Sequence, residues 1–126
     1  MTRRRIASPI AYRPVEAHSP VIEAGHYVFV SGQLPLDARG AAVEGPPAAQ
    51  VEQAVENLRL HLESVGLGLE SVVMLTVYVT TAAALAAVDG VCTRLFAQPR
   101  PARSVLGVAF LPENATVCIE AVAVRY

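Results

Sequence analysis

The sequence predicts an α+β fold in which two helices cover one face of a mixed β-sheet. Apolar residues recur three and four positions apart in two segments, and they alternate or run continuously in five shorter ones. One helical segment lies between two strands, and such a crossover requires a parallel pair. Hairpin turns elsewhere give antiparallel pairs, so the sheet is expected to be mixed.

The N-terminal part predicts strands. Residues 1–20 form a loosely patterned lead-in with at most one short edge strand near 4–8. The segments 21–24 and 27–30 flank Gly25-His26 and predict a β-hairpin. The second of these strands is expected to end at Ser31-Gly32, where glycine and proline mark a change of direction.

A long helix is predicted next, over residues 47–65. Its apolar stripe is Val51, Val55, Leu58, Leu62 and Val65, with Glu52, Glu56, Arg59 and Glu63 on the opposite side. Pro47 suits a first helical turn and Gly66 a stop.

The remaining segments alternate strand and helix. Residues 72–80 predict a strand with Val73, Leu75, Val77 and Val79 on one face. Helical spacing predicts a helix over 82–96, capped by Thr80 or Thr81, in which Gly90 costs about 1 kcal/mol. Two apolar strands, 103–111 and 117–126, follow and are joined by a polar turn.

Each of these last two strands carries a charge that packing does not explain. Glu120 lies within an apolar run, and an unpaired buried carboxylate costs several kcal/mol or more. It therefore either reaches water at a sheet edge or belongs to a site. Arg103, at the start of the preceding strand, offers two parallel N–H donors to a carboxylate, although an isolated arginine is more often an ordinary surface residue.

The composition indicates an oligomer. Hydrophobic residues make up 53% of the chain and charged ones 17%, against about 45–50% and 25% in typical domains. One domain of 126 residues cannot easily hide that much apolar surface, so we expect an oligomer joined through the uncovered face of the sheet.

Several classes of function are disfavoured. The net charge of −1 and the absence of a basic stripe argue against a nucleic-acid binder, and no apolar run could span a membrane. All ten basic residues are arginine, so no lysine is available for a Schiff base or a Walker-type phosphate loop. The three histidines lack metal-ligand spacing, and we expect no metal and no cofactor. Cys92 and Cys118 lie in apolar segments and suggest core residues in a reducing cytoplasm.

Three motifs give a family resemblance. At Ser31-Gly32-Gln33-Leu34-Pro35, Pro101-Ala102-Arg103-Ser104 and Ile119-Glu120-Ala121-Val122-Ala123-Val124-Arg125 the sequence resembles the RidA (YjgF/YER057c/UK114) family of enamine/imine deaminases. The motifs occur in the family's order, and the likeness extends over residues 20–126 within one RidA-like domain, 1–126. The resemblance implies a chorismate-mutase-like fold and a homotrimer with sites between subunits. It also implies that the last strand lies between the strand ending at Ser31 and the strand at 72–80, with the 103–111 strand beyond.

The resemblance also implies roles for particular residues. The family hydrolyses reactive 2-imino or 2-enamino acids, such as 2-aminoacrylate and 2-iminopropanoate, to 2-keto acids and ammonia. Arg103 would bind the substrate carboxylate with help from the backbone N–H of Gly32, Glu120 would position and polarise the attacking water, and Ser31 would line the pocket. Val105 stands where the family often has cysteine, and His18 takes the place of a tyrosine that lines the family's site. The loop between Phe96 and Pro101 is shorter than in the best-known members.

Two other functions remain open at this point. A trimer that kept the carboxylate-binding arginine without turnover would be a small-molecule-binding or chaperone-like protein. A ribonuclease, an activity attributed to some relatives, is disfavoured by the near-neutral charge and by an aromatic content of only 6%.

Overall fold

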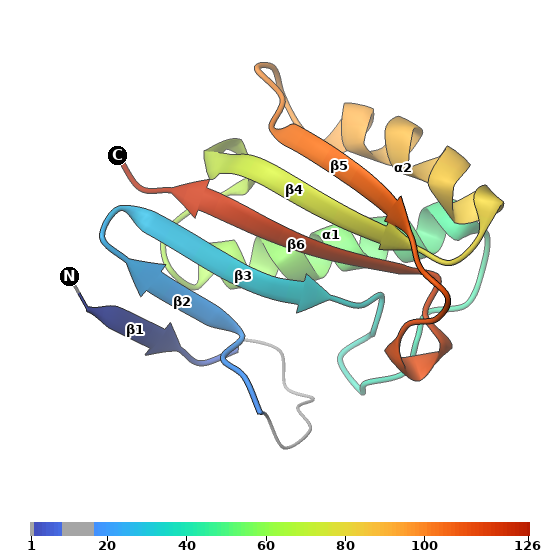
Figure 1. Cartoon of the computed structure of the whole chain (residues 1–126), viewed down its shortest axis with the longest axis horizontal. Coiled ribbons are helices and arrows are strands. Elements are labelled where there is room, and N and C mark those ends of the chain that lie inside the picture. Colours follow the sequence, from blue (N-terminus) through green and yellow to red (C-terminus); the bar gives the residue numbers. More distant parts are fainter. Residues whose placement is uncertain (1, 9–16) are drawn as a thin grey trace.

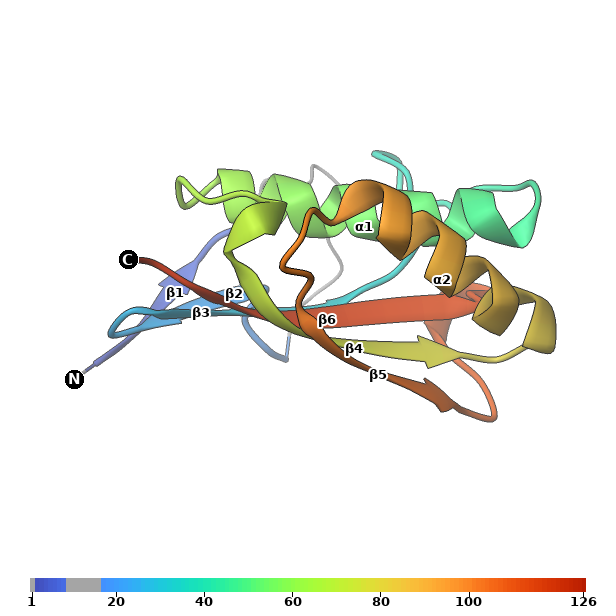
Figure 2. The same cartoon turned by 90° about the horizontal axis from the view of Figure 1, so that it is seen from above.

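The computed structural model describes residues 2–8 and 17–126. In these residues two helices lie side by side on one face of a six-stranded sheet (Figures 1 and 2). Part of the predicted lead-in, residues 9–16, lies outside the described residues. The strands are β1 (Arg3–Ile6), β2 (Val21–Ala24), β3 (Tyr27–Gln33), β4 (Val72–Val79), β5 (Ala102–Gly107) and β6 (Val117–Val124), and the helices are α1 (Pro47–Glu63) and α2 (Ala82–Leu95). Short 3-10 turns at Leu69–Ser71 and Pro112–Asn114 precede β4 and β6.

The strand order is β1-β2-β3-β6-β4-β5. Strand β6 is antiparallel to both of its neighbours, β3 and β4, whereas β4 and β5 are parallel. The prediction of a mixed sheet is therefore confirmed, as is the strand order that the family resemblance implied. The last two strands do not form a hairpin, because β4 lies between them (Figure 1).

Helix α1 forms as its periodicity predicts. It begins at Pro47, and Val51, Val55, Leu58 and Leu62 are each at most 1% exposed. On the outer side Arg59 donates hydrogen bonds to Glu56 and Glu63, its partners at i−3 and i+4. The helix ends at Glu63, two residues earlier than predicted, and Gly66 follows with φ +77°, the left-handed conformation that glycine adopts at helix ends.

Helix α2 covers the other half of the same face. The Thr81 hydroxyl oxygen accepts a hydrogen bond from the backbone N–H of Ala84 at 3.0 Å, so one of the two predicted N-caps is confirmed. Val88 and Cys92 are buried against the sheet, and Gly90 lies inside the helix as predicted.

Three details of the strands differ from the prediction. Val73 was expected in the core but is 38% exposed, because a β-bulge between Val72 and Met74 shifts the alternation and buries Val72 instead. Strand β5 ends at Gly107 rather than at 111, because it pairs only with β4, which ends at Val79. Strand β3 continues three residues past the expected end, through a bulge described below.

No described helix or strand covers the sheet face opposite α1 and α2 (Figure 2). Tyr27, Phe29 and Leu106 lie on it with 52%, 43% and 46% of their surface exposed. This is the apolar face that the composition led us to expect, and an interface with further copies of the chain stays a prediction.

Gly90, inside α2, and Gly66, just after α1, give a test of the fold. We expect Gly90→Ala to raise the free energy of unfolding by about 0.5–1 kcal/mol, because nothing lies within 4 Å of the added Cβ and alanine favours the helix. Gly66→Ala should lower it by about 1 kcal/mol or more, because φ is +77° there. Chemical denaturation at one fixed protein concentration measures both, and a destabilising Gly90→Ala would contradict the helical assignment.

Candidate functional site

A row of polar side chains crosses the otherwise apolar open face of the sheet. In the pairing registers Glu120 of β6 lies opposite Thr76 of β4, which in turn lies opposite Ser104 of β5. The neighbouring row is apolar and consists of Ile22, Phe29, Val122, Met74 and Ala102. Because side chains alternate between faces along each strand, residues that share a row point to the same side. The polar neighbours of Glu120 therefore lie along its own row and, on the side away from the apolar row, at Tyr78.

The row is completed on β3 by a β-bulge. Between the pairs Val30–Ala121 and Gln33–Ile119, β3 contains two residues, Ser31 and Gly32, and β6 contains only Glu120. A bulge of this kind bends the strand and turns its residues in new directions, and bulges are common beside active sites. The Ser-Gly motif and the carboxylate, far apart in sequence, are thus direct neighbours.

Ser31 is fixed by hydrogen bonds on every side. Its backbone N–H donates to the carbonyl of Pro20 at 3.0 Å, and its hydroxyl donates to the carbonyl of Ser19 at 2.6 Å. Its own carbonyl accepts from the buried amide of Gln33 at 2.9 Å. These bonds hold Ser31 as a structural part of the site wall. Among the described residues the partner of its hydroxyl is a backbone carbonyl and not a general base, which suits a residue that lines the pocket.

Glu120 lies on a central strand. Strand β6 has a neighbour on each side, so the interpretation that Glu120 reaches water at a sheet edge is wrong. Its Oε1 accepts a hydrogen bond from the hydroxyl of Tyr78 at 2.7 Å. This hydrogen bond, together with burial, raises the pKa of Tyr78, so the tyrosine remains a proton donor to the carboxylate at neutral pH.

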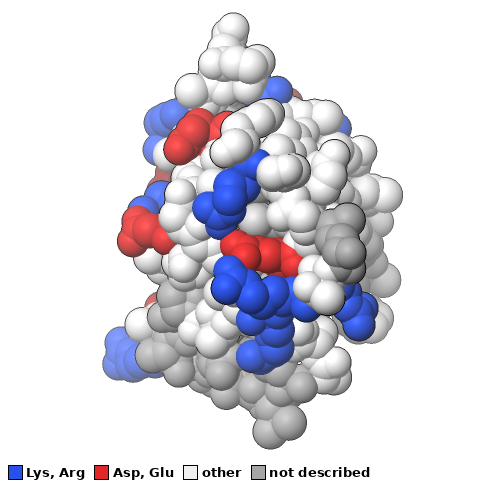
Figure 3. Space-filling view, turned by 90° about the vertical axis from the view of Figure 1, so that its left-hand side faces the viewer, with Lys and Arg blue, Asp and Glu red and all other residues white. Residues whose placement is uncertain are grey.

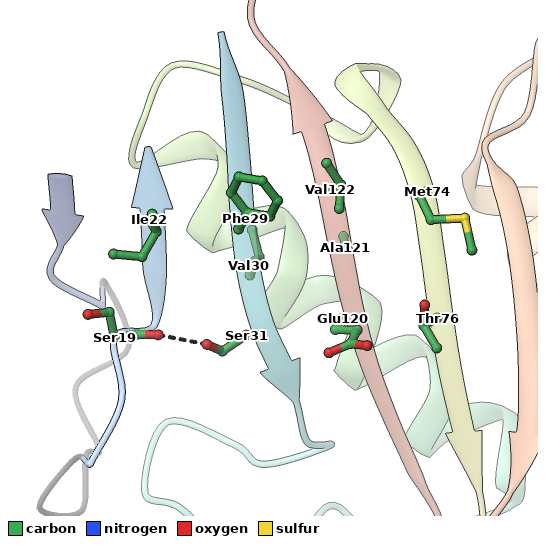
Figure 4. A pocket seen from close by; sticks show the side chains of 10 residues that line it. All are labelled: Ser19, Ile22, Phe29, Val30, Ser31, Met74, Thr76, Glu120, Ala121 and Val122. Carbon is green, nitrogen blue, oxygen red and sulfur yellow. Dashed lines mark hydrogen bonds between the residues drawn. The ribbon is translucent and has the colours of Figure 1, made fainter. Parts of the chain in front are cut away.

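Glu120 opens into a cavity of about 340 Å³ on this face (Figure 4). Figure 4 shows Glu120 and Thr76 side by side on adjacent strands, with Ser31 on the other flank turned toward Ser19. The cavity is lined by Ser19, Ile22, Phe29, Val30, Ser31, Met74, Thr76, Glu120, Ala121 and Val122. It is an apolar hollow with one carboxylate in its wall, which suits a small organic molecule attacked by water.

Arg103 faces the opposite side of the sheet. It lies opposite Leu75, which is fully buried beneath the helices, whereas Glu120 lies opposite the next residue, Thr76. Arg103 Nη2 donates a hydrogen bond to Asp89 Oδ1 of α2. Both residues line a second cavity of about 320 Å³. Burial opposes the charge on Arg103, but the hydrogen bond and charge of Asp89 outweigh it, and the pKa of Arg103 is raised.

One copy of the chain therefore does not bring all the predicted site residues together. Ser31, Gly32 and Glu120 are neighbours on the open face, and Arg103 is separated from them by the sheet itself. Val105 is half-buried on the helix side and lines a third hollow beside the start of α2. His18 is exposed and precedes Ser19, which lines the Glu120 cavity.

The two cysteines have different surroundings. Cys92 of α2 is 4% exposed and packs in the core, as predicted, but Cys118 lies on the open face in the row next to Glu120. Burial, with a smaller contribution from the charge of Glu120, raises the pKa of Cys118 to about 11. A thiol with a raised pKa stays protonated at neutral pH, so Cys118 is a poor nucleophile.

Other kinds of site find little support in the described residues. Within them no group of three or more histidines, cysteines and acids could hold a metal ion. No helix in the described ranges is long and apolar enough to cross a membrane. At the end of the molecule with both termini, basic and acidic side chains are interleaved (Figure 3), and Arg4 and Arg125 both donate to Glu23. A nucleic-acid surface needs clustered positive charge that acids do not neutralise.

Sequence reasoning missed Tyr78 and Asp89. Alternation along residues 72–80 puts Tyr78 on the face opposite Leu75, but which strand lies beside β4 cannot be read from that alternation. Asp89 lies within the segment predicted as a helix, and nothing in that pattern indicates its partner. Its partnership with Arg103 depends on how α2 packs along the edge strand β5.

Comparison with known proteins gives consistent matches over nearly the whole chain. The family model described as Endoribonuclease L-PSP matches residues 9–125. A 2-iminobutanoate/2-iminopropanoate deaminase from Dermatophagoides farinae is 33% identical over 123 residues, which are 97% of this chain and 96% of that protein.

Solved structures agree with this similarity. RidA from an Antarctic Psychrobacter superposes with a TM-score of 0.88 at 32% identity, covering 96% of this chain and 98% of that one. Escherichia coli TdcF with bound serine gives a TM-score of 0.86 at 26% identity, covering 98% of this chain and 99% of that one.

The contact between the bulge and β6 predicts a paired mutational effect. A Cβ on Gly32 would lie 2.6 Å from Cys118 Sγ, closer than the two atoms can approach. We expect Gly32→Ala to lower the free energy of unfolding by about 1–3 kcal/mol. In the double variant with Cys118→Ala most of that loss should be recovered, because the sulfur is gone. Denaturation of the wild type, both single variants and the double variant completes the cycle, and additive losses would mean that the two residues are not in contact.

Proposed function

The chain belongs to the RidA (YjgF/UK114) family, and on this basis we propose that an oligomer of it hydrolyses 2-imino acids and their enamine tautomers to 2-keto acids and ammonia. One observation carries the proposal: a carboxylate on a central strand opens into an apolar cavity beside the Ser31-Gly32 bulge. The names of relatives support the same chemistry, with 2-iminopropanoate and 2-iminobutanoate as model substrates.

Arg103 is the proposed carboxylate-binding residue. A guanidinium keeps its charge at any physiological pH and offers paired N–H donors that match both oxygens of a carboxylate. In the described chain the Arg103 side chain is 30% exposed, so a small ligand can reach it. We propose that the backbone N–H of Gly32 assists in holding the same group.

Glu120 is the proposed water-binding residue. Its carboxylate would orient one water against the C=N carbon and draw away its proton as the oxygen attacks. The C–O bond forms and the proton passes to the nitrogen, which gives a carbinolamine. The remaining hydroxyl proton is then transferred to the nitrogen as the C–N bond breaks, so that ammonia leaves and the C=O bond of the keto acid forms. Because the imine carbon is already electrophilic, orientation and one activated water suffice without a cofactor.

The site requires two copies of the chain. Arg103 and Glu120 lie on opposite faces of one sheet, so a small substrate cannot touch both in one protomer. Arg103, however, belongs to the edge strand β5, which a neighbouring copy can approach from the side. We propose a homotrimer in which the Arg103 edge of one protomer meets the Glu120 cavity of the next. Val105 and His18 would then border the entrance, and we propose the cytoplasm as the compartment.

Two alternative functions are a ribonuclease and a binding protein without turnover. The family description names an endoribonuclease, but acidic partners neutralise Arg4, Arg125 and Arg59 on the surface, and the net charge is −1. A carboxylate-binding protein without turnover would keep Arg103 and the cavity and would not need Glu120 to hold a water.

The first functional prediction concerns turnover. With 2-iminobutanoate generated in situ by a threonine dehydratase, we expect the wild type to accelerate loss of the imine. Arg103→Ala should abolish this acceleration, and Glu120→Gln should reduce it by about 10²–10³-fold, the usual cost of losing a general base. Arg94→Ala, which removes an arginine from another exposed ion pair, is the matched control and should behave as wild type. Binding of 2-keto acids by a wild type that gives no acceleration would favour the non-catalytic alternative.

The second functional prediction tests whether the site is shared. Arg103→Ala and Glu120→Gln protomers, each inactive alone, are unfolded together and reassembled as mixed oligomers. About one quarter of wild-type activity should return from a 1:1 mixture, because a site is intact when each protomer supplies its unaltered residue. Light scattering on the same samples gives the oligomer size. No recovery from well-assembled mixed oligomers would mean that both residues act within a single protomer.

A further inference from the structure

The cavity that contains Arg103 is distinct from the Glu120 cavity within the chain. It lies at the edge of the sheet between α2 and β5, and its volume is about 320 Å³. Leu75, Cys92 and Phe96 give it an apolar floor. Its charged lining residues are Arg103, Arg100 and Asp89, so two cations and one anion surround a single small space.

Asp89 is the residue that the proposed function leaves unexplained. It lies within α2, its side chain is 77% exposed, and among the described residues its carboxylate accepts a hydrogen bond from Arg103 alone. An ion pair this exposed contributes little to folding. Its position is nevertheless specific. Asp89 accepts a hydrogen bond from the Arg103 guanidinium, the group that we propose binds the substrate carboxylate.

A bound substrate would bring a second carboxylate to the same guanidinium. Two carboxylates on one guanidinium still repel each other, and a positive charge carried by the ligand close to Asp89 would offset that repulsion. In a 2-imino acid the nitrogen is attached to the carbon next to the carboxylate, and in its protonated form it is a cation with N–H donors. With the carboxylate on Arg103, that nitrogen lies within reach of Asp89. A 2-keto acid has only oxygen lone pairs at the equivalent position.

We propose that Asp89 is a specificity-determining residue that accepts a hydrogen bond from the protonated nitrogen of the ligand. The Arg103–Asp89 pair then selects molecules with a cationic nitrogen next to a carboxylate and disfavours 2-keto acids. This inference rests on the proposed function, because it takes Arg103 as the carboxylate-binding residue. Serine, the molecule bound to the similar TdcF, has this arrangement of charges. One consequence is that hydrolysis converts a ligand that Asp89 attracts into one that it repels, which favours product release.

Equilibrium binding separates this role from catalysis. Two stable ligands with the same carbon skeleton are titrated calorimetrically at pH 7 into the assembled wild type: 2-aminobutanoate, a zwitterion, and 2-oxobutanoate, an anion. Asp89→Asn is nearly isosteric and keeps a hydrogen-bonding side chain without the charge. We expect it to weaken 2-aminobutanoate and to strengthen 2-oxobutanoate, so that the ratio of the two dissociation constants changes by about tenfold.

Two further variants make the outcome decisive. Glu52→Gln removes the acid of the exposed Arg94–Glu52 ion pair, lies outside this cavity, and should leave the ratio unchanged. Arg103→Gln should weaken both ligands. If Arg103→Gln weakens both but Asp89→Asn leaves their ratio unchanged, the inference about Asp89 is overturned and the proposed function stands. If Arg103→Gln affects neither ligand, or the wild type binds neither, the carboxylate-binding role of Arg103 fails and the inference with it.

Discussion

The carboxylate of Glu120 is the constraint on which the site depends. It lies in the middle of a β-sheet, on a face whose neighbouring row is apolar, where an anion without partners would be costly. The sheet meets that cost locally. Tyr78 donates a hydrogen bond from the next row, Thr76 lies beside Glu120, and the bulge at Ser31-Gly32 opens a cavity on the other flank. Glu120 also lines that cavity, where in the proposed reaction its carboxylate holds the attacking water.

The pleat of the sheet determines how many copies the reaction needs. Arg103 and Glu120 differ by one position in the registers that link them through β4, and one position reverses the face. A single chain therefore separates the proposed carboxylate-binding residue from the proposed water-binding residue. The open face that carries Glu120 also exposes Tyr27, Phe29 and Leu106. Burying these side chains against another copy would remove apolar surface from water and so favour association. In this arrangement the apolar face and the divided site favour the same assembly.

The sequence predicted the helices and strands well, because an element that is buried on one side repeats its apolar residues at a regular spacing. The stripe Val51–Val55–Leu58–Leu62 is specific to a helix packed on one side, and the cap at Thr81 is local chemistry. Val73 was misassigned because a bulge shifts the alternation, and a bulge depends on pairing with β6 that the strand itself does not encode. The strand order came only from family resemblance. In the same way the motifs singled out Arg103 and Glu120 as candidates, whereas Tyr78 and Asp89, whose hydrogen bonds arise from packing between elements, were not recognised.

The two charged groups of the proposed site have environments that suit different tasks. A guanidinium stays charged at any physiological pH, so an edge strand is a suitable position for it, and in our proposal Asp89 adjusts which ligands Arg103 accepts. Water activation requires a fixed acceptor in a space from which bulk water is largely removed, and a central strand provides the rigid backbone for it. Moving Arg103 into the middle of the sheet would bury a cation, and moving Glu120 to the edge would expose the acceptor to solvent. The division of the site between an edge and a face thus follows from the chemistry of each group, and it is the reason that assembly and activity should be lost together.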